Sequence, residues 1–202
     1  MPLFFLSCQQ GQNKPPQGIV SLTPALTSIL VDLGLEGRII GVVKQDFVLN
    51  RPVVGSMIQF SLEKILSLNP RYVVYQDFQK PWIQPILHQK NINFIEIPLS
   101  NIDSIFKAGQ SLSQAFNLSN KILENKQLEF QSFKNSLPPF VFLALIDTEP
   151  NFFKVYVAGL KSYLSEILCF LGGENILKIE KESVLLTQEY FLSLPQDIVI
   201  LD

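Results

Sequence analysis

The sequence predicts an α/β fold, with two three-layer lobes of mainly parallel strands joined by a long helix. Three observations favour this fold. Short apolar or β-branched segments alternate with amphipathic ones from Gly18 onward, as in parallel sheets covered by helices. A mainly helical stretch over residues 101–136 divides this alternation into two parts. A segment that begins at Ser61 also has a counterpart that begins at Thr187.

The expected domain boundaries follow from this division. Residues 18–117 form the first lobe, residues 118–136 the interlobe helix and residues 137–202 the second lobe. Residues 1–17 precede them as a signal-like segment and linker. With 47% hydrophobic and 17% charged residues, the chain has the composition of a packed globular protein.

Local signals define the elements of the first lobe. Gly18–Leu22 predicts a short buried strand. Thr23 and Pro24 suit the N-cap and the first position of a helix, which Gly34 ends. The other elements expected up to residue 136 are strands at residues 38–43, 72–75 and 92–97, and helices at residues 62–68, 80–90, 101–116 and 119–136.

The second lobe begins after Pro138-Pro139, which end the helical stretch. Phe140–Ile146 is strongly apolar and predicts a strand, and a loop follows it from Asp147. The remaining expected elements are strands at residues 154–157 and 197–201 and helices at residues 163–171 and 188–194.

The segments that begin at Ser61 and Thr187 share one pattern. Each has a hydroxyl N-cap, a Glu two residues later, a short apolar helix, a Pro stop and a β-branched strand. We expect a pseudo-twofold relation between the lobes, and independent use of the same helix–Pro–strand pattern is the alternative. Glu63 and Glu189 also have a purely structural explanation, since a carboxylate in the first turn stabilises the helix dipole.

The N-terminus resembles a bacterial lipoprotein signal in part. Leu6-Ser7-Cys8 matches the end of such a signal, which predicts lipidation of Cys8, and the following Pro-, Gly- and Gln-rich stretch suits a tether. The basic n-region is missing and the apolar part is short, so a plain hydrophobic N-terminus is the alternative.

Charge and motifs exclude several classes of function. The 16 basic and 18 acidic residues are spread along the chain, so we expect no binding of nucleic acid. The chain has no P-loop, no Gly-x-Gly-x-x-Gly turn after a strand and no Gly-x-Ser-x-Gly elbow. With a single histidine, His88, we expect no catalytic residue, no metal site and no cofactor.

Several segments together resemble the periplasmic solute-binding proteins of ABC importers, of the class III, helical-backbone type that binds cobalamin or iron siderophores. These segments are Gly18–Leu30, Leu33–Val43, Val54–Pro70, Tyr156–Gly159, Tyr163–Leu168 and Leu171–Asn175. The resemblance covers nearly the whole chain from Gly18 onward, and the order and spacing of the segments carry it.

The resemblance implies a ligand site between two lobes and docking of each lobe to a membrane permease through a surface Glu. Glu63 matches the first docking position. The second falls on Gln188 in an ungapped comparison and on Glu189 with a one-residue deletion. Because members of the family usually continue beyond the strand at residues 197–201, the resemblance also implies that the second lobe is incomplete.

Candidate ligand contacts lie at the carboxyl ends of the expected strands, where open α/β sheets bind their ligands. Capping also explains Thr23 and Pro24, turns explain Asp46 and Asp77, and a place in the core is the alternative for Phe47 and Phe78. The candidates are Thr23, Pro24, Ala25, Asp46, Phe47, Met57, Gln76, Asp77, Phe78, Asp147 and Tyr163.

The expected ligand is a large, weakly charged metal chelate. One histidine is too few for bare zinc or manganese, and three arginines are few for a highly charged catecholate siderophore. Cobalamin or another corrinoid is the first candidate, and haem or a ferric siderophore is the next.

We therefore expect a monomeric binding protein in the periplasm or on the outer face of the cytoplasmic membrane, which delivers a chelate to an ABC permease. One alternative is a lipid-anchored binding or sensory module of the same fold that takes no part in transport. An α/β enzyme without a recognisable motif is the other.

Overall fold

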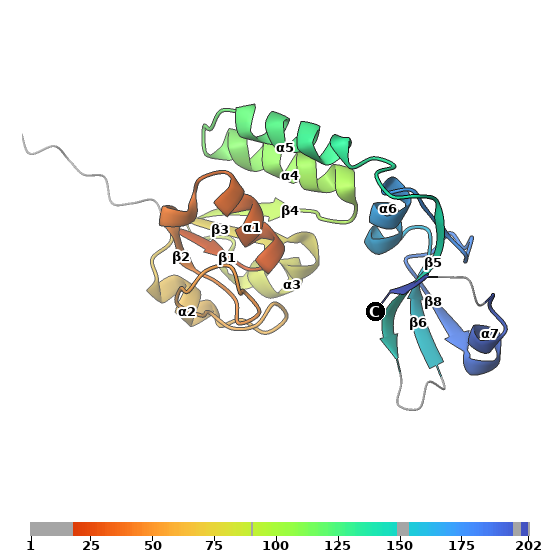
Figure 1. The fold of residues 1–202 in the computed structure, drawn as a ribbon. Helices are drawn as coiled ribbons and strands as arrows, with labels where there is room; N and C mark the ends of the chain where they lie inside the picture. The colour runs from red at the N-terminus through yellow and green to blue at the C-terminus, as the bar shows by residue number, and fades with distance from the viewer. Residues whose placement is uncertain (1–17, 90, 149–153, 196–198, 202) are drawn as a thin grey trace, which may run out of the picture. The chain divides into compact units, whose positions relative to one another are not determined.

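The computed structural model of the protein describes residues 18–89, 91–148, 154–195 and 199–201. The chain divides into two compact units, residues 1–97 and 98–202, and each is described by itself (Figure 1). The proposed lipidation site Cys8 lies outside the described residues.

The first unit contains a four-stranded sheet in which every pair of neighbours is parallel, as the sequence predicts. The order is β2-β1-β3-β4, and Ile19 of β1 lies opposite Ile39 of β2 and Tyr72 of β3. Parallel strands need long connections, and helical segments supply them here. The strands are β1 (Ile19–Ser21), β2 (Ile39–Gly41), β3 (Tyr72–Gln76) and β4 (Asn93–Ile97).

Figure 1 shows the helices of the first unit packed around this sheet. Thr23 caps α1 as predicted, because its hydroxyl oxygen accepts a hydrogen bond from the Leu26 amide at 3.4 Å. A single helix is predicted at residues 80–90, but the structure has two short pieces there, α3 and η3. Each has a proline in its first two positions, and a proline inside a longer helix would interrupt its hydrogen bonds. The elements are α1 (Pro24–Asp32), η1 (Glu36–Arg38), α2 (Leu62–Ser67), η2 (Asp77–Gln79), α3 (Lys80–Ile83) and η3 (Gln84–Ile86).

The central strands of this sheet form the core of the first unit. Val20 of β1 and Val73 of β3 are fully buried, and Ile65 of α2 and Ile83 of α3 pack into the same cluster. Burial on both faces explains why these strands are short apolar runs rather than alternating ones. The core therefore holds the carboxyl ends of β1 and β3 in fixed positions.

The second unit begins with two helices and continues into a mixed sheet. The strand order is β7-β5-β6-β8, and β9 also pairs with β5. Strand β5 is parallel to β7 and β9 but antiparallel to β6, and β6 is antiparallel to β8. The elements are α4 (Ile102–Ala115), α5 (Lys121–Ser132), β5 (Phe140–Thr148), β6 (Lys154–Ala158), α6 (Tyr163–Phe170), β7 (Gly173–Asn175), β8 (Ser183–Thr187), α7 (Gln188–Leu192) and β9 (Val199–Leu201).

This sheet differs from the mainly parallel one that the sequence predicts. Only residues 149–153 separate β5 from β6, and a connection of that length is too short for a parallel crossover, so the two strands pair antiparallel. Strands β7 and β8 are not among the predicted elements. Two of the three residues of β7 are Gly173 and Asn175, which are types that strands generally avoid.

Helices α4 and α5 pack on α6 within the second unit. The Phe130 ring stacks on Phe170 with centroids 4.3 Å apart and meets the edge of Phe106 at 5.5 Å. The Ile102 amide at the start of α4 donates to a carboxylate oxygen of Glu166 at 2.8 Å. The two helices confirm the predicted helical stretch, whereas the role of residues 118–136 as an interlobe bridge stays a prediction.

The two units repeat one topology. The order β1-α1-β2-α2-β3 in the first unit corresponds to β5-α6-β7-α7-β9 in the second, and in each the first strand is parallel to the other two. Strands β6 and β8 are additions before α6 and α7. The similar segments at Ser61 and Thr187 therefore belong to a longer structural correspondence.

Gly34 and Gly172 occupy corresponding places in this repeat, just after α1 and α6. Their φ angles are 77° and 115°, which residues with side chains rarely adopt. A Cβ atom added at Gly34 meets no atom within 4 Å, whereas one at Gly172 lies 2.9 Å from the Leu137 carbonyl oxygen. An alanine at Gly34 would thus cause backbone strain only, whereas an alanine at Gly172 would cause backbone strain and a steric clash.

We expect Gly34→Ala to lower the free energy of unfolding by about 1 kcal/mol through backbone strain alone. Gly172→Ala adds the collision with Leu137, so its loss should be larger, about 2–3 kcal/mol. Urea unfolding followed by circular dichroism measures both. Equal losses for the two variants would contradict this explanation.

Candidate functional site

The carboxyl end of the first-unit sheet is organised by one buried side chain, Gln79. Its Nε2 donates to the Leu22 carbonyl oxygen at 2.9 Å and to the Met57 carbonyl oxygen at 2.7 Å. Its Oε1 accepts a hydrogen bond from the Gln76 amide at 3.0 Å. Gln79 thereby joins the segment after β1, the segment after β3 and the turn at residues 56–59, which together with residues 44–47 after β2 we call the first-unit edge.

A second set of bonds joins the segment after β2 to the same turn. The Met57 amide donates to Oε1 of Gln45 at 3.2 Å, and the Lys44 amide donates to the Gly55 carbonyl oxygen at 2.6 Å. Gly55 has a φ of 141°, and a Cβ there would lie 2.4 Å from Cα of Phe60, so the turn requires glycine. The structure therefore brings all four segments of the first-unit edge together.

The predicted residues Thr23, Pro24 and Ala25 lie at the start of α1. Thr23 is buried and its hydroxyl serves the helix cap, so the structural explanation accounts for this side chain. Pro24 is half-buried and Ala25 is exposed at the first-unit edge.

Asp46 and Phe47 differ sharply in their surroundings. One Asp46 carboxylate oxygen accepts from the Val48 amide at 2.9 Å and from the Leu49 amide at 3.2 Å, which is a turn as foreseen. Phe47 is 95% exposed, so the alternative of a core position for it is wrong.

Large apolar side chains are exposed at the first-unit edge. Phe78 and Trp82 are 44% and 46% exposed, and their rings meet edge to face with centroids 6.5 Å apart. Ile58, in the turn beside Met57, is 65% exposed. Contiguous exposed apolar surface marks binding or interaction sites, and the Phe78–Trp82 pair is contiguous. We call Phe47, Ile58, Phe78 and Trp82 the apolar edge group.

Trp82 is absent from the residues that the sequence indicated. Its spacing of four from Phe78 was the available signal, because residues four apart share one face of a helical segment. Gln76 and Asp77 lie in the same segment, Gln76 half-buried and Asp77 exposed.

A polar cluster lies near the ends of β3 and β4. The Tyr75 hydroxyl donates to Oε2 of Glu96 at 3.0 Å, and Lys80 Nζ lies 2.9 Å from the same oxygen. Burial and the bond to Glu96 raise the pKa of Tyr75 to about 12. The hydrogen bond from Lys80 lowers the pKa of Glu96.

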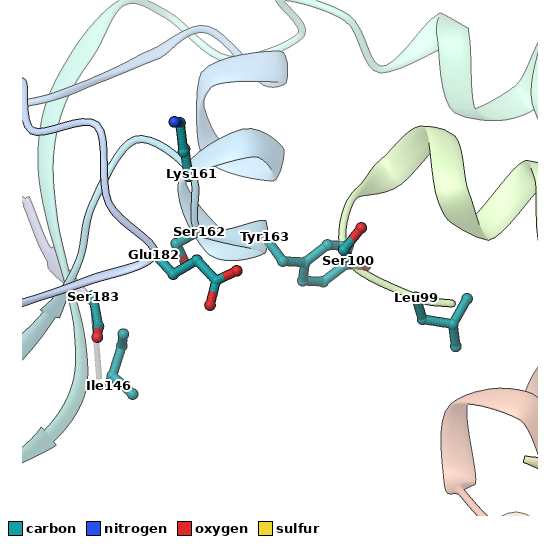
Figure 2. Close-up of a pocket in the computed structure, with 8 residues that line it drawn as sticks. All are labelled: Leu99, Ser100, Ile146, Lys161, Ser162, Tyr163, Glu182 and Ser183. Carbon is teal, nitrogen blue, oxygen red and sulfur yellow. The ribbon is translucent and has the colours of Figure 1, made fainter. Parts of the chain in front are cut away.

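The second unit has a separate cavity of about 380 Å³ at the start of α6 (Figure 2). The Tyr163 ring extends from α6 toward Ser100. Burial and the nearby carboxylate of Glu166 raise the pKa of Tyr163, so this side chain stays a neutral hydrogen-bonding group. The lining residues are Leu99, Ser100, Ile146, Lys161, Ser162, Tyr163, Glu182 and Ser183.

Asp147 does not lie in a loop as the sequence predicts. Strand β5 continues through Thr148 because Asp147 and Thr148 pair with Tyr156 and Val155 of β6. In the described part of the chain, no three His, Cys, Asp or Glu side chains gather in a way that could hold a metal ion.

The two candidate docking residues occupy matching positions. Glu63 and Glu189 are each the second residue of a helix, after the hydroxyl caps Ser61 and Thr187, and both are exposed. Gln188 is the first residue of α7. The helix positions therefore favour Glu189 over Gln188 as the counterpart of Glu63.

Comparison with known proteins bears on the fold of the chain. No model of a protein family matches the chain. The high-affinity haem uptake system protein IsdE of Staphylococcus aureus is 25% identical over 209 residues, which cover 96% of this chain and 69% of that protein. The periplasmic haem-binding protein HutB of Vibrio cholerae superposes with a TM-score of 0.76 at 22% identity, over 87% of this chain and 72% of that one.

The chain has the fold of the periplasmic solute-binding proteins. The periplasmic vitamin B12 binding protein BtuF of Vibrio cholerae has it too, with a TM-score of 0.66 at 20% identity over 88% of this chain and 73% of that one. These likenesses confirm the class III resemblance and the α/β fold class that the sequence indicates. No helix in the described ranges is long and apolar enough to cross a membrane.

The Tyr75–Glu96 bond predicts a specific dependence of stability on pH. Because the pKa of Tyr75 is raised from 10.0 to about 12 in the folded protein, its contribution is complete below pH 10 and is lost as the pH rises toward 12. We expect the melting temperature of the wild-type protein to fall more steeply over this range than that of Tyr75→Phe. Parallel curves would contradict the assignment.

Proposed function

We propose that this protein binds a metal chelate outside the cytoplasmic membrane and delivers it to an ABC permease. The fold supports this proposal, because the solved structures that share it carry names as haem, vitamin B12 or iron-binding proteins. Their names are those of binding proteins, which favours binding over catalysis for this chain as well. The observation that carries the proposal is the apolar edge group, which lies on and beside segments that Gln79 and Gln45 join by hydrogen bonds.

A tetrapyrrole chelate suits this surface best. Aromatic faces and edges at Phe47, Phe78 and Trp82 can pack against a flat, largely apolar macrocycle. Covering such side chains contributes about 25 cal/mol per Å² of apolar area removed from water. Corrinoids are the first candidate from the sequence, and the haem proteins among the relatives give haem equal standing.

The other predicted residues remain proposed contacts. Ala25, Met57, Gln76 and Asp77 lie on the segments of the first-unit edge. Tyr163 brings a ring and a hydroxyl to the cavity of the second unit. Asp147 remains a proposed contact only because it is still near the carboxyl end of β5, although within the strand and not in a loop after it.

Trp82 is the only tryptophan in the chain, so its fluorescence reports directly on the first-unit edge. We expect saturable quenching when the purified protein is titrated with haem or with cobalamin, together with a rise in melting temperature. Absence of both changes with haem, cobalamin and a ferric siderophore would overturn the proposal.

Phe47 offers a matched test of the surface. We expect Phe47→Ser to weaken the binding of the preferred chelate about tenfold, since the variant loses roughly 1.4 kcal/mol of apolar contact. Phe133→Ser is the control, because Phe133 is also exposed but lies at the end of α5 in the second unit. Equal affinities of the wild type and Phe47→Ser would remove Phe47 from the site.

Delivery to a permease predicts an effect of charge reversal on the docking helices. Glu63→Lys and Glu189→Lys should each lower chelate uptake into vesicles that contain a permease accepting the wild-type protein, while chelate affinity stays unchanged. The physical reason is repulsion between the new cation and basic groups of the permease. Glu129→Lys is the control, because Glu129 is an exposed carboxylate on α5.

Unchanged uptake with both reversals would remove the docking assignment. Chelate binding without acceptance by any permease would favour the non-transport binding or sensory module. Attachment to the membrane through Cys8 remains a separate proposal, which metabolic labelling of the intact precursor with a radioactive fatty acid would test.

A further inference from the structure

Gln79 is a polar side chain with 0% exposure in the core of the first unit. In the sequence it stands between Phe78 and Trp82, two exposed aromatic residues of the apolar edge group. Ile83, four residues after Gln79, is also fully buried and belongs to the core of the first unit. A buried amide is costly unless its hydrogen bonds are made, and Gln79 makes three.

Each of these three bonds ends on a segment that carries proposed ligand contacts. Leu22 directly precedes Thr23, Pro24 and Ala25, and its carbonyl oxygen accepts from Nε2 of Gln79. Met57 is itself a proposed contact, and its carbonyl oxygen accepts the second bond. Gln76, which begins the segment leading to Phe78, donates the third.

We propose that Gln79 is the positioning residue of the ligand site, which sets the spacing of the three segments before the ligand arrives. It acts through the backbone and does not touch the ligand, since its side chain is fully enclosed. The amide group suits this role because it donates two hydrogen bonds and accepts one at fixed angles. The inference rests on the proposed function for the identity of the ligand. The joining of the three segments by Gln79 does not depend on that function.

Replacement of Gln79 by methionine tests this role. Gln79→Met keeps the length and approximate volume of the side chain and removes all three bonds. We expect affinity for haem or cobalamin, whichever the wild type prefers, to fall at least tenfold in the Trp82 fluorescence titration, because the segments lose their preset spacing. We also expect faster amide hydrogen exchange at residues 22–25 and 55–60 of the ligand-free protein.

Ile39→Ala is the matched control. Ile39 is buried in the same sheet, at the amino end of β2 and hence at the opposite edge. Its truncation leaves a cavity in the core and should lower the melting temperature at least as much as Gln79→Met does. We expect chelate affinity and exchange at residues 55–60 to stay at wild-type values in this control.

The outcomes separate the two proposals. If the wild type binds a chelate and Gln79→Met binds it equally well, the positioning role is wrong although the function stands. If Ile39→Ala loses affinity in proportion to its stability, the effect of Gln79 is general and the role is also wrong. If the wild type binds neither haem nor cobalamin, the function fails, and the exchange experiment alone decides whether Gln79 fixes the three segments.

Discussion

The loops at the ends of buried strands must satisfy their backbone hydrogen bonds away from water, and this constraint shapes both units. In the first unit, the Gln79 side chain satisfies three such backbone groups, the carbonyl oxygens of Leu22 and Met57 and the amide of Gln76. In the second, the Asn175 side chain donates to the Ala158 carbonyl oxygen and to the Ser165 hydroxyl, and it accepts from the Leu177 amide. One buried amide in each unit thus fixes where chain segments leave the sheet. Irregular segments held in this way can present side chains to a ligand with little entropy left to lose.

The two units use the same framework for surfaces of different character. The first-unit edge exposes aromatic and aliphatic groups, with Phe47 almost fully in solvent and Phe78 and Trp82 close to half exposed. The cavity of the second unit is lined by three serines, a lysine and a glutamate besides Tyr163 and two aliphatic residues. The first surface therefore offers apolar contact, and the second offers hydrogen-bonding and charged groups.

Local signals allowed most of the first unit to be predicted, whereas the site depends on contacts between distant residues. Helix starts are predictable at Thr23, Pro24 and Ser61, because N-capping and the fixed φ of proline act within four residues. The structure confirms these starts. The short connection at residues 149–153 is a local sign of the antiparallel hairpin of β5 and β6. The extension of β5 through Asp147 depends in addition on pairing with Tyr156 of β6. Gln79 is the clearest case, because Leu22 lies 57 residues away from it in the sequence. From sequence alone, a glutamine after a strand is expected at the surface, because glutamine is mostly exposed in proteins. Only the tertiary contacts show that Gln79 is buried.

The topological repeat explains why Glu63 and Glu189 have the same local geometry. In both units, the helix that carries the glutamate is capped by a hydroxyl and followed by a strand parallel to the first strand of the unit. A carboxylate at the second helical position is stabilised by the helix dipole whether or not a partner is present. The dipole therefore accounts for the presence of a glutamate at each place. The dipole does not require that both side chains be exposed. Glu63 and Glu189 are both exposed, at topologically equivalent helices of the two units, so both carboxylates are open to a partner that carries basic groups.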